Sequence, residues 1–253
     1  MNKNTIVPGV AAPNRRRWSI LSTEMDRLLF LSMLFSCLLI VARVVHTEHR
    51  HFIFLIWNLF LAYIPYFIST QLTRLKAAGE GTRPGTGVAG RQPVRGPRSL
   101  GWWILALLWL LFIPNSFYII TDLYHLGDLY NDRIMPQWFD LAMILSFVWN
   151  GLLLGVLSVR QMERIFLPRL TLMKELLFLY PVMWLNALGI YIGRYLRYNS
   201  WDIVTDPFGL LRDIATLIVH PLRHQNVWDM VLCFSILMTL IYLLMKRISK
   251  ALT

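Results

Sequence analysis

The stretch SLGWWILALLWLLFIPNSFYIIT, residues 99–121, contains no Asp, Glu, Lys or Arg. A helix crosses the ~30 Å hydrocarbon core of a bilayer in about 20 apolar residues, so this stretch is long enough to span a membrane. Further uncharged runs occupy residues 28–42, 52–73, 141–159, 176–193 and 230–245. The two shortest runs reach spanning length by adding residues 43–44 or 228–229. The sequence therefore predicts an all-α, polytopic bundle of six transmembrane helices.

A further short helix is expected after the fifth span. Asp206 followed by Pro207 is a typical helix start, with Asp as N-cap and Pro in the first helical position. Apolar residues recur from there until His220 and Pro221, over a length too short to cross a bilayer. We expect an external amphipathic or re-entrant helix that covers the outer end of the bundle like a lid.

The distribution of charge predicts the orientation of the spans. Segments 1–27, 74–98, 160–175 and 246–253 carry most of the 25 Lys and Arg residues, whereas the remaining segments hold more acids than bases. Basic residues are retained on the cytoplasmic side, so both termini are predicted to be cytoplasmic. The net charge of +11 is then a topology signal that also favours contact with anionic lipid, and no nucleic-acid partner is expected.

Four parts of the chain differ in composition. Residues 1–27 form a basic cytoplasmic segment and an uncleaved leader, and residues 28–73 hold an N-terminal pair of spans. Residues 74–98 are rich in Gly, Pro and basic residues, which predicts a flexible cytoplasmic linker. Residues 99–253 form a four-helix unit that includes the external segment 194–229.

The third span ends in a polar face. At the α-helical pitch, Asn115, Tyr118, Asp122 and His125 fall within a sector of about 80°. Pro114 removes one backbone donor, and in lipid the resulting kink is tolerated only against protein or water. We therefore expect this face to point into the bundle.

The fifth span offers a surface that faces it. Asn186, Gly189, Gly193 and Arg197 are expected to share one helical face, and glycines at this spacing allow close helix approach. We expect a polar cluster at the outer end of the bundle. It comprises two candidate catalytic residues, Asp122 and His125, and seven candidate ligand-binding residues, Asn115, Tyr118, Asp140, Arg194, Arg197, Asn199 and Asp202.

The residue types suggest a role for each part of this cluster. The planar guanidinium groups of Arg194 and Arg197 suit a phosphate or carboxylate. Asp122 and His125 would handle a proton, since imidazole titrates near neutral pH, and Asn115 and Tyr118 would orient the ligand. The alternative interpretation is an Arg–Asp network that only locks the spans together, because charges near the membrane core are costly and tend to pair.

A metal site is not expected. Asp122 and His125 supply only half of a ligand set, and the spacing does not require Asp128, Asp132, Asp140 or His220 to complete it. No nucleophile elbow, phosphate loop or HExxH motif occurs either. The sequence names no cofactor and no oligomeric state, and it leaves open whether the protein is an enzyme.

Three hypotheses for function remain. The first is an outward-facing site that binds or processes an anionic head group or a small envelope metabolite. The second is a transporter or channel subunit, which needs polar residues that continue through the membrane to the inner face. Beyond Asn58, Asn150 and Asn186 there are few, amides such as Asn58 and Asn150 are more typical of contacts between helices, and no acidic residue lies at mid-depth. The third is a structural or assembly subunit.

Two blocks of the sequence resemble a known family. PNSFYIITDLYHL, residues 114–126, and GRYLRYNSWD, residues 193–202, are similar to the signature blocks of domain-of-unknown-function family 1361, a group of uncharacterised bacterial membrane proteins. The resemblance extends from about residue 55 to the C-terminus. Members commonly have a small residue and Pro where this chain has Ser116-Phe117, so the local helix break is expected to differ. The resemblance implies a multi-pass protein of a bacterial cytoplasmic membrane and no particular reaction.

Overall fold

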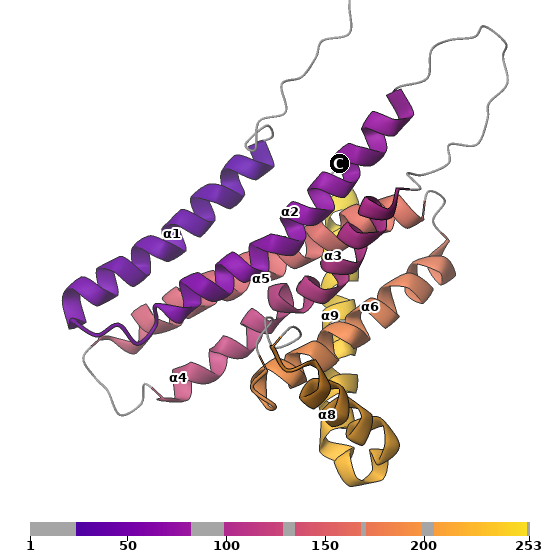
Figure 1. Ribbon diagram of the computed structural model, residues 1–253. Coiled ribbons are helices and arrows are strands. Elements are labelled where there is room, and N and C mark those ends of the chain that lie inside the picture. The colour runs from indigo at the N-terminus through magenta and orange to yellow at the C-terminus, as the bar shows by residue number, and fades with distance from the viewer. Residues whose placement is uncertain (1–23, 82–98, 129–134, 168–170, 199–204, 252–253) are drawn as a thin grey trace, which may run out of the picture.

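A computed structural model describes the chain over residues 24–81, 99–128, 135–167, 171–198 and 205–251 (Figure 1). These residues form helices, and no strand occurs among them. The elements are α1 (Glu24–Thr47), α2 (Phe54–Gly81), α3 (Leu100–Tyr118), the 3₁₀-helix η1 (Ile119–Tyr124), α4 (His125–Asp128), α5 (Gln137–Phe166), α6 (Leu172–Arg194), α8 (Pro207–Val219), the 3₁₀-helix η2 (Pro221–His224) and α9 (Gln225–Ala251).

The prediction of six spans is confirmed. Within the described residues, six helical segments are long and apolar enough to cross a membrane: α1, α2, α3 with η1, α5, α6 and α9 with η2. Each contains most or all of one of the uncharged runs. Successive spans run in opposite directions, so α8, η1, α4 and the first turns of α2 and α5 gather at one end, here called the α8 end (Figure 1).

The spans do not pack in chain order. Helix α2 packs against α3 and α5, α3 also packs against α6, and α6 packs against α9. Helix α1 packs mainly against α5. Helix α2 continues to Gly81 and includes the first residues of the expected linker, whose residues 82–98 lie outside the described part of the chain.

Helix α3 approaches α5 and α6 closely because a glycine, which has no side chain, lies at each of the two contacts. A Cβ at Gly155 of α5 would lie 2.9 Å from the ring of Phe117, and a Cβ at Gly189 of α6 would lie 2.7 Å from Pro114 Cβ. Both distances are shorter than van der Waals contact. The two small-residue pairs, Gly151 with Gly155 and Gly189 with Gly193, therefore face opposite sides of α3, as bundle packing requires.

Polar side chains inside the spans bond across helices. Ser158 of α5 accepts from Trp109 Nε1 at 2.8 Å and donates to the carbonyl of Pro65 at 2.9 Å. Asn150 Nδ2 donates to Ser36 Oγ at 3.0 Å and so connects α5 to α1. In hydrocarbon an unpaired polar group is costly, so these bonds fix which helix faces meet.

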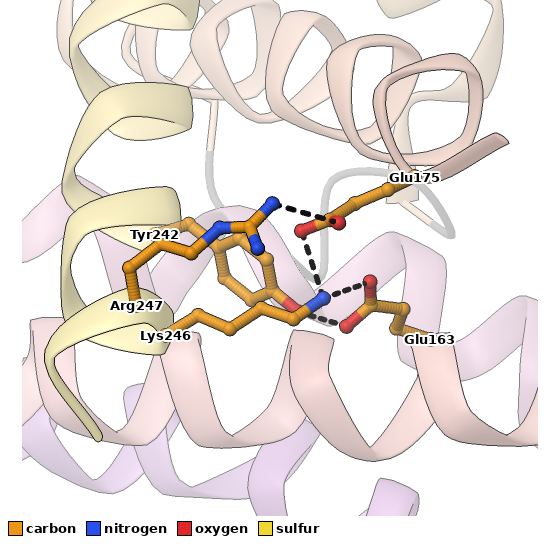
Figure 2. A network of polar contacts seen from close by, with 5 residues as sticks. All are labelled: Glu163, Glu175, Tyr242, Lys246 and Arg247. Atoms are coloured by element: carbon orange, nitrogen blue, oxygen red, sulfur yellow. Dashed lines mark hydrogen bonds and ion pairs between the residues drawn. The ribbon is translucent and has the colours of Figure 1, made fainter. Parts of the chain in front are cut away.

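A buried ionic network joins α9 to α5 and α6 at the end opposite to α8 (Figure 2). Lys246 Nζ lies 2.5 Å from Glu163 Oε1 and 2.8 Å from Glu175 Oε1. Tyr242 Oη donates to the second oxygen of Glu163 at 2.5 Å, and the half-exposed Arg247 lies 3.8 Å from Glu175 Oε2. Lys246 is only 2 % exposed, and both carboxylates are paired. Such a network holds three helices in one arrangement, and removing one partner would leave a buried charge unpaired.

Candidate functional site

A cavity of about 440 Å³ lies towards the α8 end, between α2, α3, α6 and α8. Pocket volumes of this size suit small organic ligands. Its wall is mostly apolar, with a few amide and phenol groups. The lining residues are Asn58, Leu61, Leu110, Leu111, Pro114, Asn115, Tyr118, Leu185, Leu188, Gly189, Ile192, Gly193, Tyr198, Leu210 and Ile214.

The polar face predicted for the third span divides at the end of α3. Asn115 and Tyr118 line the cavity, and Asn115 Nδ2 also donates to the carbonyl of Phe112 at 3.1 Å. After Tyr118 the chain tightens into η1, which turns about 120° per residue instead of 100°. Asp122 is therefore rotated away from the cavity and is fully buried.

Asp122 is held by two helices. Asn58 Nδ2 of α2 donates to Asp122 Oδ2 at 2.9 Å, and Arg194 Nη1 of α6 lies 3.7 Å from Asp122 Oδ1. That second oxygen has no hydrogen-bond partner within the described residues, so the arginine supplies a charge without a formed hydrogen bond. Because Asn58 also lines the cavity, it connects the cavity wall to the buried ion pair.

Arg194 brings His125 into the same group. Arg194 Nη1 lies 3.3 Å from His125 Nε2, and its guanidinium carbon lies 5.7 Å from the centre of the Tyr124 ring. His125 also contacts the ring of Phe54 at the start of α2. The Arg194 side chain is 20 % exposed, so an outside ligand can reach it while Asp122 stays enclosed. We call Asn58, Asp122, His125 and Arg194 the polar cluster.

Asp140 does not join the polar cluster, contrary to expectation. Its Oδ1 accepts from Arg43 Nε at 2.7 Å, both side chains are nearly buried, and the guanidinium also lies over the ring of Phe52 at 4.4 Å. Asp140 begins α5 on the side that faces α1, so its charge is neutralised there. This pair fixes α1 to α5 and leaves no role for Asp140 in the cavity.

Arg197 is also placed differently from the prediction. Helix α6 ends at Arg194, and Arg197 has a φ of 60°, which is the left-handed region. Because the helix has ended before it, Arg197 does not share a continuous helical face with Gly189 and Gly193, and its side chain is exposed. Asn199 and Asp202 lie outside the described residues. Among the described residues no three His, Cys, Asp or Glu side chains gather as metal ligands.

The prediction of a short helix after Asp206 is confirmed. Asp206 caps α8 by accepting from the backbone N–H of Gly209 at 3.0 Å. Leu210 and Ile214 of α8 line the cavity, and Asp213 accepts from Tyr198 Oη at 3.0 Å. Helix α8 therefore covers one side of the cavity.

Sequence reasoning missed several residues of the site. Asn58 was interpreted only as a contact between helices, although an amide in a span is a recognisable polar signal. Tyr198 was passed over because it follows the end of a span. Leu210 and Ile214 are ordinary members of an apolar stripe, and nothing in their spacing distinguishes a cavity wall from packing.

A comparison with known proteins identifies one family. Residues 57–241 match the family model described as "Protein of unknown function (DUF1361)". The matched range includes every residue that lines the cavity, as well as all four members of the polar cluster. No curated protein and no solved structure matches the chain.

Proposed function

The chain belongs to the DUF1361 family of proteins of unknown function, and we propose that it is an integral membrane protein whose α8 end binds an anionic group from the outer side of the membrane. The anionic group belongs to a membrane head group or to a small envelope metabolite. Arg194 binds it, and the neighbouring cavity receives the remainder of the molecule.

One observation carries this proposal: Arg194 is partly accessible while the groups around it are held in place. Its nearest carboxylate, Asp122, is fully buried and lies 3.7 Å away, so the ion pair is loose. A guanidinium has five N–H donors, and a contact at this distance does not saturate them. An arriving phosphate or carboxylate can therefore accept hydrogen bonds from Arg194 without displacing Asp122.

The other members of the polar cluster have complementary roles in the proposal. Asp122, which accepts a hydrogen bond from Asn58, neutralises the side of Arg194 that faces the protein. His125, whose Nε2 lies 3.3 Å from Arg194 Nη1, would exchange a proton with the bound group. Asn115 and Tyr118 would orient the part of the ligand that enters the cavity.

The outward orientation rests on the charge of the segments between spans. Segments 1–27, 74–98, 160–175 and 246–253 carry 18 of the 25 Lys and Arg residues, and their described helical parts lie at the end opposite to α8. Retention of basic segments in the cytoplasm then places the α8 end outside. The polar cluster would face the extracytoplasmic surface.

The experiment compares two lipids that share chains but differ in head group. Dioctanoylphosphatidylglycerol, which is anionic, and dioctanoylphosphatidylcholine, which is zwitterionic, are titrated into the full-length protein in neutral detergent while thermal unfolding is followed. We expect the anionic lipid to stabilise the protein more. Arg194→Gln should weaken this effect by roughly tenfold or more in apparent affinity, since a hydrogen bond to a charged group contributes about 1.5–3 kcal/mol.

Arg223→Gln is the matched control, because Arg223 is exposed in η2 on the same side of the protein. This variant should respond as the wild type does. An equal response of the wild type to both lipids would contradict the proposal. So would an unchanged response of Arg194→Gln, and the polar cluster would then be a structural lock between α2, η1 and α6.

A further inference from the structure

The cavity wall changes from apolar to polar along the bundle axis. Helices α3 and α6 both run towards the α8 end, so sequence position measures depth on each of them. On α3 the lining begins with Leu110 and Leu111 and ends with Asn115 and Tyr118. The interval from Leu110 to Tyr118 corresponds to about 12 Å of helix. On α6 the lining likewise begins with leucines, and it ends beyond the helix at Tyr198.

The apolar part of the cavity adjoins the membrane-facing surface. Leu111 of α3 is 42 % exposed and Leu185 of α6 is 40 % exposed, although both residues line the cavity. Both lie within spans, where an exposed side chain contacts lipid. Two side chains of the cavity wall are thus exposed at membrane depth, which favours an opening towards the bilayer at this level. An opening towards the bilayer suits a lipid ligand rather than a water-soluble metabolite.

Helix α8 adds an apolar surface at the polar end. Phe208 is 83 % exposed, and Leu211 and Ile218 are also exposed, while Leu210 and Ile214 face the cavity. A helix with apolar residues outward at a membrane end lies in the interface between head groups and acyl chains. It therefore covers the cavity at the depth where lipid head groups lie.

From these three observations we infer that the cavity holds the acyl chain of a lipid whose anionic head group lies at Arg194. The inference rests on the proposed function and names its ligand class. The chain enters between α3 and α6 at Leu111 and Leu185 and lies against the leucines of both helices. The polar groups of Asn58, Asn115 and Tyr118 then meet the part of the lipid that links chain to head group.

The test asks whether an acyl chain is required and where it lies. The full-length protein in nanodiscs of phosphatidylcholine receives phosphatidylglycerol that carries a photoactivatable diazirine at the end of one acyl chain. After illumination, cross-linked peptides are mapped. We expect cross-links to concentrate on residues 107–118 and 185–198. Cross-links spread evenly over lipid-facing positions of α1 and α9 would overturn the inference.

A pair of matched variants gives a second measurement. Leu188→Trp fills the cavity, and Leu107→Trp places the same side chain on the lipid-facing side of α3, outside the cavity. Filling the cavity should lower cross-linking at these peptides by about tenfold, which corresponds to the loss of a few buried methylenes. Leu107→Trp should cross-link as the wild type does. If Leu188→Trp does not fold, the cross-link map alone decides.

A chainless probe separates this inference from the proposed function. Glycerol phosphate and inorganic phosphate are titrated beside dioctanoylphosphatidylglycerol in the thermal unfolding assay. If all three stabilise the wild type equally and Arg194→Gln abolishes each effect, the anion site stands and the acyl-chain inference fails. If the anionic lipid stabilises the protein no more than the zwitterionic lipid does, the proposed function itself is wrong. Stabilisation by the anionic lipid alone supports both.

Discussion

Asn58 lines the cavity and donates a 2.9 Å hydrogen bond from Nδ2 to Oδ2 of Asp122, which does not line it. The amide therefore lies between a space that a ligand can enter and a carboxylate that is closed to solvent. Through Asn58 and Asp122, occupation of the cavity is connected to Arg194, which lies 3.7 Å from the same carboxylate.

Asn58→Leu should destabilise the protein. The change removes the only hydrogen bond to a fully buried carboxylate within the described residues. An unsatisfied buried acceptor costs about 1–3 kcal/mol. Thermal unfolding of the purified protein in detergent should show the loss. Asn226→Leu, at an exposed position in the first turn of α9, is the control and should unfold as the wild type does. Equal unfolding temperatures for the two variants would refute a role for the Asn58 amide.

Lys246→Met should have a larger effect on stability. It leaves Glu163 and Glu175 buried without the ammonium group that lies 2.5 Å and 2.8 Å from them. Breaking a buried ion pair from one side costs about 3–5 kcal/mol. Lys174→Met, at an exposed position of α6, removes the same charge without this effect. Thermal unfolding again provides the measurement.

A double-mutant cycle identifies the cause of that loss. Glu163→Gln combined with Lys246→Met leaves Glu175 with Arg247, which lies 3.8 Å from it. The double variant should be more stable than Lys246→Met alone, because the uncompensated carboxylate has been removed. If the two changes add independently, the network in Figure 2 does not act as a unit.

Much of the fold was predictable because lipid imposes strong rules on sequence. Uncharged runs marked each of the six spans, and Asp206 with Pro207 marked the start of α8. The glycine spacings indicated close packing, and the structure places Gly189 against Pro114. These features depend on local sequence and on the thickness of a bilayer, and both can be evaluated from the sequence alone.

The site was less predictable because its geometry depends on where each helix ends or tightens. A uniform α-helical pitch put Asp122 on the face of Asn115, whereas η1 rotates it away. The end of α6 at Arg194 separates Arg197 from the face it was expected to share. The pairing of Asp140 with Arg43 depends on α1 packing against α5, which chain order does not indicate.

The buried network was misjudged for a different reason. Glu163, Glu175 and Lys246 were counted as cytoplasmic loop charges that fix topology. Yet Tyr242 and Lys246 are four residues apart and continue the buried face of α9 that includes Ser235, Met238 and Thr239. Periodicity of burial extended past the uncharged run would have indicated that these charges face other helices.

The close contact between α3 and α6 makes a prediction that needs no ligand. In Gly189→Ala the new Cβ would lie 2.7 Å from Pro114 Cβ, so the two helices must separate. Overpacking of this kind costs about 1–3 kcal/mol. Gly101→Ala, at the start of α3, meets no atom within 4 Å and replaces glycine with a better helix former, so it should be neutral or slightly stabilising. If both variants unfold at the wild-type temperature, the contact is looser than described.

The orientation of the bundle can be measured with single cysteines. In a background in which Cys37 and Cys233 are serine, His220→Cys places a thiol at an exposed position of the α8 end, and Ala77→Cys places one at the exposed last turns of α2. We expect a membrane-impermeant maleimide to label His220→Cys in intact cells and to label Ala77→Cys only after permeabilisation, because basic segments are retained in the cytoplasm. The reverse pattern would place the polar cluster on the cytoplasmic side. The anion bound at Arg194 would then have to come from the cytoplasm or the inner leaflet, and the proposed outer ligand would be excluded.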